Sequence, residues 1–298
     1  DVFTATSEYE GERHFALKVL RSDLLELRRD RERRREEMRV KEVKKRFTNE
    51  AFIQWHLSKS VSEDVTRSVV KVFDHGEFDS TLRFRFILME RMASTLRDFV
   101  NDKENSVPDP ELLKYKALLM LRVAQIIGAV HKEGIFHRDV KPENILFPRR
   151  QLPYFVSTLH TFEEALYQIQ VKLGDFGTVR WVRSYGDQYD GVIVGSQYYM
   201  SPEQIYDPEH LDLRTDIYSF GIVCYELLYG RHPKQVRAET DNFLEKLAKQ
   251  TPAPRTPPGG YEGLHEIIMG CMHTRYRRFQ SMDEVVSRLV GFVRTLFC

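Results

Sequence analysis

The stretch His137-Arg138-Asp139-Val140-Lys141-Pro142-Glu143-Asn144 decides the fold, together with Asp175-Phe176-Gly177 further along the chain. The first stretch supplies a carboxylate that can accept a proton from a hydroxyl, then a lysine, then an asparagine carbonyl that can hold a metal ion. The second stretch supplies another carboxylate next to a glycine. Two metal ligands, a base and a cation that converge on one point suit phosphoryl transfer, in which catalysis is mostly positioning and charge neutralisation.

Length and composition fit a globular protein with two parts. The chain of 298 residues is too long for one small core. Its hydrophobic share of 42% and charged share of 30% are typical of soluble proteins, and its net charge of +1 gives no general attraction to nucleic acid or membrane. The three cysteines lack paired spacing, so we expect a reducing, cytoplasmic location, either as a separate protein or as part of a larger one. No apolar run reaches membrane-spanning length.

The motifs resemble those of the eukaryotic-type protein kinases. A short His-Arg-Asp string alone is a weak signal, but eight matching residues followed by Val171-Lys172-Leu173-Gly174-Asp175-Phe176-Gly177 form a specific one. The resemblance runs nearly end to end. It implies an α+β bilobal protein-kinase fold, with a small β-rich N-lobe over residues 1–92 and a larger helical C-lobe over residues 93–298.

Residue patterns predict elements that suit this fold. β-Branched and aromatic residues between turn residues predict strands at residues 2–6, 15–20, 69–74 and 84–89. Apolar periodicity, or a lack of Gly and Pro, predicts helices at residues 24–57, 112–132 and 215–229. The last of these is apolar enough to be a buried central helix.

Two segments look inserted relative to the family pattern. Residues 28–46 are dense in Arg, Lys and Glu, which indicates either a solvated helical extension held by charge pairs or a docking or anion-binding surface. Residues 148–170 separate Asn144 from Asp175 more widely than the family usually does. This segment contains the aromatic residues Tyr154, Phe155, Phe162 and Tyr167. They indicate that the segment packs against the rest of the protein and is not a loose loop.

The resemblance assigns the catalytic roles residue by residue. Lys18, in Phe15-Ala16-Leu17-Lys18, would meet the α- and β-phosphates of ATP and be steadied by Glu50. Asp139 would be the catalytic base, and Lys141 would neutralise charge on the transferred group, as in serine/threonine kinases. Asn144 and Asp175 would hold Mg²⁺.

The nucleotide base is expected between apolar side chains of both lobes. By their places in the motifs, Ala16 and Leu146 would sandwich adenine, with Val2 above it. Met89 falls at the gatekeeper position, and the backbone from Glu90 to Met92 would form the hinge that hydrogen-bonds adenine. The same apolar residues could equally be ordinary core residues. Only their positions relative to the family motifs favour an adenine site.

Other matches imply structural roles, and three departures stand out. Glu203 would pair with Arg278, and Asp216 would receive backbone amides of the catalytic loop. The Gly-rich phosphate loop is missing, because the sequence starts where its last glycine would be. Gln54 stands where the family packs an apolar residue, so we expect an unpaired amide that makes its helix easier to displace. Ser196 replaces the usual threonine and keeps a hydroxyl near Asp139 and Lys141.

The segment from Asp175 to Glu203 resembles an activation segment, in which Arg138 would sit in a basic pocket that receives a phosphate. Ser184 is the expected regulatory site, because Thr178 lies too near the metal-binding turn and Ser196 contacts the substrate. Tyr185 and Tyr189 are less favoured phosphorylation sites. In a competing explanation, the carboxylates of Asp187 and Asp190 occupy the basic pocket and no phosphate is needed.

The leading interpretation is a protein serine/threonine kinase that transfers the γ-phosphate of Mg-ATP to protein hydroxyls. The alternative is a pseudokinase that acts as a scaffold or allosteric partner, but Lys18, Asp139 and Asp175 are all retained. A small-molecule or lipid kinase fits the Ser201-Pro202-Glu203 segment less well, and nucleic-acid binding fits poorly because acidic residues interleave the basic run. Residues 199–205 resemble both bacterial eukaryotic-like kinases and the translation-factor stress kinases. The protein substrate, the regulatory input and the oligomeric state stay open.

Overall fold

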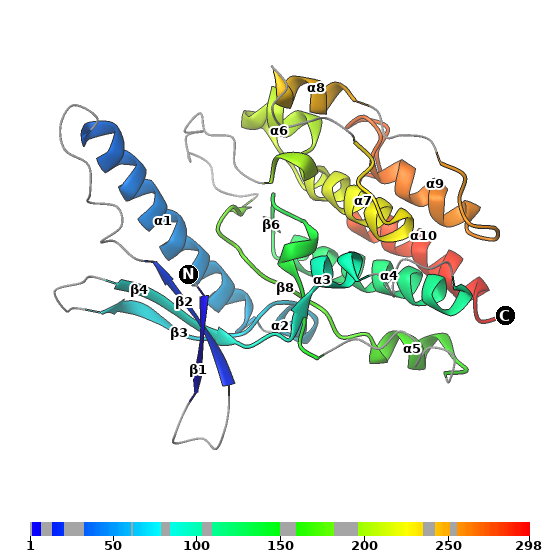
Figure 1. Cartoon of the computed structure of the whole chain (residues 1–298), viewed down its shortest axis with the longest axis horizontal. Coiled ribbons are helices and arrows are strands. Elements are labelled where there is room, and N and C mark those ends of the chain that lie inside the picture. Colours follow the sequence, from blue (N-terminus) through cyan, green and yellow to red (C-terminus); the bar gives the residue numbers. More distant parts are fainter. Residues whose placement is uncertain are drawn as a thin grey trace.

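The computed structural model describes residues 2–6, 14–20, 33–60, 62–78, 84–102, 109–149, 159–181, 196–234, 242–250 and 255–298. Within these ranges a small strand-rich part stands beside a larger, mostly helical part (Figure 1). This is the division that the sequence predicts. No helix in these ranges is long and apolar enough to cross a membrane.

The strand-rich part is one antiparallel sheet in the order β1-β2-β4-β3. Its strands are β1 (Val2–Thr6), β2 (His14–Leu20), β3 (Val72–Phe78) and β4 (Phe84–Glu90). The expected strand at residues 69–74 is wrong at its start, because Val69 instead forms a parallel bridge with Leu173 of the other part of the molecule. The ladder with β4 begins only at Val72, which pairs with Met89.

Helix α1 (Arg33–Leu57) packs along this sheet and joins the two parts of the molecule. Phe47 and Ala51 pack with Val72 and Ile87 in the small core of the sheet. Ile53 and Leu57, one turn apart, belong instead to the large core of the helical part. Residues 33–46 of the charged segment continue this helix, and residues 28–32 lie outside the described ranges. The short helix α2 (Glu63–Ser68) then leads to β3.

The helical part is built around two buried helices, α4 (Pro110–Lys132) and α7 (Arg214–Tyr229). Both carry apolar residues on nearly every side and are therefore covered all round. Helix α10 (Met282–Thr295) packs on α4, and helix α9 (Glu262–Cys271) packs on α7. The remaining helices are α3 (Leu96–Asn101), α5 (Phe162–Gln168), α6 (Pro202–Tyr206), α8 (Phe243–Lys249), α9 (Glu262–Cys271) and α10 (Met282–Thr295).

Short strands fix the loops that carry the predicted site residues. Strands β5 (Ser94–Thr95), β7 (Ile145–Phe147) and β8 (Lys172–Leu173) form a three-stranded sheet, and β6 (Ile135–Phe136) pairs with β9 (Arg180–Trp181). The loop that the sequence predicts to be the catalytic loop runs from β6 to β7 through a turn of 3-10 helix, Pro142–Asn144. Asp175 follows the end of β8, so both loops emerge from paired strands.

The segment 148–170 is only partly packed as expected. Phe162 is buried at the start of α5 and meets the ring of Phe297. Tyr167, by contrast, is 75% exposed, so this aromatic residue is not packed as predicted. Tyr154 and Phe155 lie outside the described residues.

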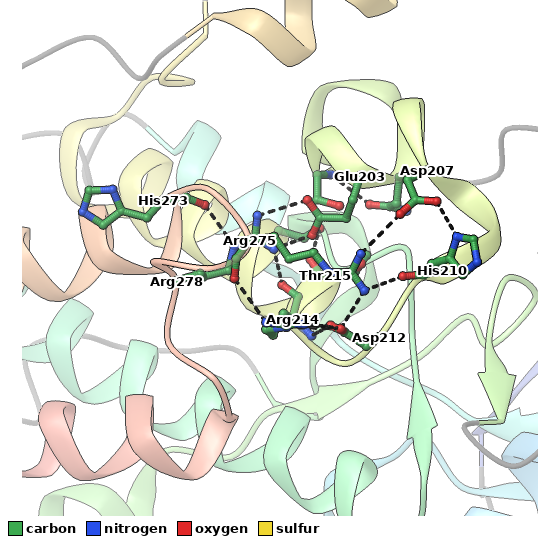
Figure 2. Close-up of polar contacts among 12 residues, drawn as sticks. Glu203, Asp207, His210, Asp212, Arg214, Thr215, His273, Arg275 and Arg278 are labelled. Atoms are coloured by element: carbon green, nitrogen blue, oxygen red, sulfur yellow. Dashed lines mark hydrogen bonds and ion pairs between the residues drawn. The ribbon is translucent and has the colours of Figure 1, made fainter.

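A buried ion pair ties α6 to the chain before α10, as Figure 2 shows. The Arg278 guanidinium donates to both Glu203 oxygens, at 2.5 and 3.2 Å, and also to the carbonyls of Arg214 and His273. Both charged groups are buried, so the attraction between them must offset the free-energy cost of removing each charge from water. The expected pairing of Glu203 with Arg278 is therefore present.

Replacing Arg278 with alanine should lower the free energy of unfolding by about 3–5 kcal/mol, because Glu203 would remain as a buried, unpaired charge. Denaturant unfolding monitored by circular dichroism measures the change. Arg277→Ala is the matched control, because Arg277 is the exposed neighbour and its loss should change stability by no more than about 0.5 kcal/mol. Equal stabilities of the two variants would contradict the structural role of Arg278.

Candidate active site

The catalytic loop is anchored on the buried carboxylate of Asp216, in the first turn of α7. One oxygen accepts from the amide of His137 at 2.7 Å and the other from the amide of Arg138 at 2.8 Å. The ring of His131 bonds the first oxygen at 2.9 Å. Burial opposes the charge of Asp216, but these contacts outweigh it and hold the pKa of the carboxyl below its ordinary value. Asp216 thus plays the role that the sequence predicts.

Arg138 lies in the left-handed backbone region, with a φ of 64°. This conformation is costly for a residue other than glycine, and the bond from its amide to Asp216 helps to hold it. Its side chain donates from Nε to the carbonyl of Thr178 at 2.5 Å and from Nη2 to that of Val179 at 3.4 Å. The guanidinium therefore already contacts the start of the expected activation segment. Ser184, Tyr185, Asp187, Tyr189 and Asp190 lie outside the described residues.

Asp139 is the centre of a hydrogen-bond cluster. Its carboxylate accepts from the Lys141 ammonium at 2.8 Å, from the Ser196 amide at 2.6 Å and from the Asn144 side-chain nitrogen at 3.2 Å. Lys141 also donates to the Ser196 hydroxyl at 2.7 Å. The structure therefore brings together the predicted base, the predicted cation and the predicted hydroxyl.

The segment that carries Asp175 is braced against the catalytic loop. The His137 ring bonds the carbonyl of Gly174 at 3.0 Å and meets the Phe176 ring edge-on at 5.0 Å. Thr178 donates from its hydroxyl to the carbonyl of His137 at 2.9 Å. Glycine at 174 allows close packing, because a Cβ there would lie 2.6 Å from a methyl group of Leu146 and 3.3 Å from one of Val70. These contacts fix where the Asp175 carboxylate stands relative to Asp139.

Lys18 of β2 reaches both acidic partners that the sequence predicts. Its Nζ lies 2.5 Å from Glu50 of α1 and 3.4 Å from Asp175. Burial opposes the charge on Lys18, but the two carboxylates outweigh it and raise the pKa of the ammonium above its ordinary value. Burial also raises the pKa of Glu50, so its ionised form depends on Lys18 staying close. For Asp175 burial acts against ionisation, whereas Lys18, His137 and Lys141 lower its pKa overall.

Asn144 and Asp175 offer oxygen ligands of the kind that Mg²⁺ prefers. The Asn144 nitrogen is committed to Asp139, with bonds to its carbonyl at 2.8 Å and to its carboxylate at 3.2 Å. The carbonyl oxygen is therefore the atom of Asn144 that can serve as a ligand. Asp175, with a φ of 60° and a side chain 46% exposed, lies with Asn144 in the lining of one pocket. The donor set fits a divalent cation that completes its shell with phosphates and water.

The residues expected around adenine come from both parts of the molecule. Ala16 pairs with Met89 across β2 and β4, and Val2 pairs with Lys18 across β1 and β2. Leu146, in β7, is half-buried against Gly174. Glu90 at the start of the expected hinge is fixed by a 2.7 Å bond from Lys172 and by its own amide, which donates to the carbonyl of Lys71. Met92 is half-buried beyond it.

The side-chain amide of Gln54 was expected to be unpaired, and this expectation is wrong for the amide nitrogen. Gln54 is 1% exposed, and its Nε2 donates to the carbonyl of Val70 at 2.9 Å. Only its Oε1 is buried with no hydrogen-bond partner in the described part of the chain. The amide therefore connects α1 to its surroundings instead of weakening its attachment.

A pocket of about 800 Å³ opens beside the cluster, bordered by Lys141, Asn144, Asp175 and Ser196. Its far wall holds polar residues that sequence reasoning missed. Arg97 bonds Glu143 at 2.8 Å and Glu226 at 2.7 Å, and it also contacts the hydroxyl of Tyr199. Tyr199 in turn donates to Glu226 at 2.6 Å. Glu143 lies in the first quoted motif and Tyr199 in residues 199–205, but Arg97 and Glu226 lie in neither, and no sequence signal links the four residues.

Comparison with known proteins gives one consistent result. The family model described as "Protein kinase domain" matches residues 8–288. A probable serine/threonine-protein kinase of Clostridium perfringens is 30% identical over 83% of this chain and 32% of its own length. The serine/threonine-protein kinase PknL of Mycobacterium tuberculosis is 34% identical over 73% of this chain and 48% of its own length. The human serine/threonine-protein kinase ULK1 is 27% identical over 86% of this chain and 23% of its own length. The chain thus spans between about a quarter and a half of these relatives.

Asp216→Asn should lower turnover at least about tenfold and destabilise the protein by about 1–3 kcal/mol. Both Asp216 oxygens accept from buried donors, and an amide would turn its own NH₂ toward one of them and leave it unsatisfied. Steady-state kinetics and thermal unfolding measure the two effects. The control is Asp283→Asn, because Asp283 is 66% exposed and its ion pair in the described part of the chain is with the exposed Lys132. Wild-type turnover in Asp216→Asn would contradict its anchoring role.

Proposed function

Because the chain belongs to the protein kinase domain family, we propose that it transfers the γ-phosphate of ATP to serine or threonine hydroxyls of protein substrates. The observation that carries the proposal is the cluster in which Lys141 bridges the Asp139 carboxylate and the Ser196 hydroxyl. A lysine at this position suits serine/threonine acceptors. Lys18, Asp139 and Asp175 are all present and in contact with their expected partners, so no observation favours a pseudokinase.

In this mechanism Asp139 accepts the proton of the acceptor hydroxyl. Its carboxylate is held by three N–H donors, so it needs no reorientation when the substrate binds. Lys141 places a positive charge beside the same point, where it neutralises charge on the transferred phosphoryl group. The Ser196 amide donates to Asp139 and the Ser196 hydroxyl accepts from Lys141, so Ser196 holds both groups.

The nucleotide would lie between Lys18 and the segment of Asp175. Lys18, oriented by Glu50, would contact its phosphates, and the base would stack between Ala16 and Leu146. A divalent cation, which we take to be Mg²⁺, would be held by Asn144 and Asp175 and would neutralise phosphate charge. We also propose a cytoplasmic location, where ATP is available and the buried thiols Cys224 and Cys271 stay reduced.

The acceptor segment of the protein substrate would occupy the pocket beside Ser196. This pocket reaches from Lys141 to the cluster of Arg97, Glu143 and Glu226. Burial opposes the charge on Arg97, but the two glutamates outweigh it and raise the pKa of the guanidinium. The wall of the pocket is therefore a set of paired charges that can exchange hydrogen bonds with a polypeptide backbone.

Asp139→Asn should reduce phosphoryl transfer at least about a thousandfold and leave the affinity for Mg-ATP within about twofold of wild type. The base acts on the acceptor hydroxyl, whereas the nucleotide is held by other groups. Radiolabel transfer and calorimetry measure the two quantities. The matched variant Asp175→Ala should weaken Mg-ATP binding and also lower the rate of phosphoryl transfer. Near-normal turnover in Asp139→Asn would contradict the assignment of Asp139 as the catalytic base.

Phosphorylation at Ser184 is the expected regulatory event in the activation segment. A phosphate would add a charge of up to about −2 and draw cationic side chains to the segment. Incubation with Mg-ATP followed by mass spectrometry should find the phosphate on Ser184, and Ser184→Ala should slow turnover. A fully active enzyme with an unmodified segment would transfer the role to Asp187 and Asp190.

A further inference from the structure

We propose that Gln54 is a positioning residue that holds helix α1, and through it Glu50, in place relative to the segment that carries Asp175. The inference rests on the proposed function, since it concerns the geometry of the same site. Glu50 and Gln54 are one turn apart on α1 and lie on the same helix face. The first bonds Lys18 and the second bonds Val70, so two side chains of one face fix the helix at two points.

The Gln54 contact continues to the metal-ligand segment through the backbone. Val70, whose carbonyl accepts from Gln54, donates its own amide to the carbonyl of Leu173 at 3.0 Å. Leu173 ends β8 and is followed by Gly174, whose amide donates to the carbonyl of Asn144 at 3.0 Å. This series of hydrogen bonds and backbone links therefore runs from α1 to the backbone of Asn144 and to Leu173 and Gly174, the two residues that precede Asp175. A shift of α1 that breaks the Lys18–Glu50 pair must also strain this series.

Packing alone does not explain a glutamine at this position. The side chain is 1% exposed, and its Oε1 has no hydrogen-bond partner among the described residues. A buried polar atom without a partner is unfavourable, and an apolar side chain of similar volume would avoid that cost. The favourable contribution of the amide therefore lies in the bond from Nε2 to Val70.

Gln54→Met tests the proposal, because methionine is unbranched and similar in length but cannot donate to Val70. We expect kcat/KM to fall about tenfold, because the Val70 carbonyl loses its donor and α1 loses one of its two fixed points. Gln168→Met is the matched control, because Gln168 is exposed at the end of α5 and should leave kcat/KM unchanged. Gln54→Leu should behave like Gln54→Met, and higher activity or stability in Gln54→Leu would overturn the proposal.

A double-mutant cycle with Glu50→Gln separates positioning from general stability. If Gln54 acts through Glu50, the effect of Gln54→Met should shrink to within about twofold in the Glu50→Gln background. An undiminished tenfold loss would show that Gln54 acts by another route and would overturn the proposal.

Hydrogen exchange provides a reading that does not depend on activity. Gln54→Met should speed exchange of the Val70 amide and of residues 171–177, while the amides of α7 stay as protected as in wild type. Unchanged exchange at Val70 would refute the inference even if the protein proved to have no kinase activity. An inactive wild-type protein would instead count against the proposed function alone.

Discussion

The buried carboxylate of Asp216 is the contact on which the geometry of the site depends. It sits in the first turn of α7, the helix with the most complete burial, and it binds two consecutive amides of the catalytic loop. Because the second amide belongs to Arg138, this contact helps to hold the left-handed backbone that precedes Asp139. The buried core of the helical part thus fixes the backbone from which the Asp139 side chain extends.

The nucleotide side of the site depends on a weaker junction between the two parts of the molecule. Lys18 lies 2.5 Å from Glu50 but 3.4 Å from Asp175, whose side chain is 46% exposed. The shorter contact orients the lysine, and the longer one is the contact that phosphates and a metal ion would replace. Since Glu50 is on α1, a shift of this helix would move the partner of Lys18. The proposed kinase activity should therefore be sensitive to contacts of α1 that are remote from the nucleotide.

Sequence reasoning located the parts of the site that lie within short motifs. Asp139, Lys141 and Asn144 share one run, and Glu203, Arg278 and Asp216 were assigned by motif register and found in their expected contacts. The Arg97–Glu226 contact joins residues 129 positions apart with no pattern between them. The partner of the Gln54 nitrogen is a backbone carbonyl, which leaves no mark in the sequence, so this nitrogen was wrongly expected to be unpaired. The start of β3 was misplaced for a similar reason, because Val69 pairs outside the sheet.

The most direct test of this account is phosphoamino acid analysis after incubation of the protein with γ-labelled ATP, Mg²⁺ and a mixture of protein substrates. The account predicts label on serine and threonine, dependent on the divalent cation and absent without the protein. Tight binding of Mg-ATP without any transfer of label, or transfer to tyrosine alone, would contradict it.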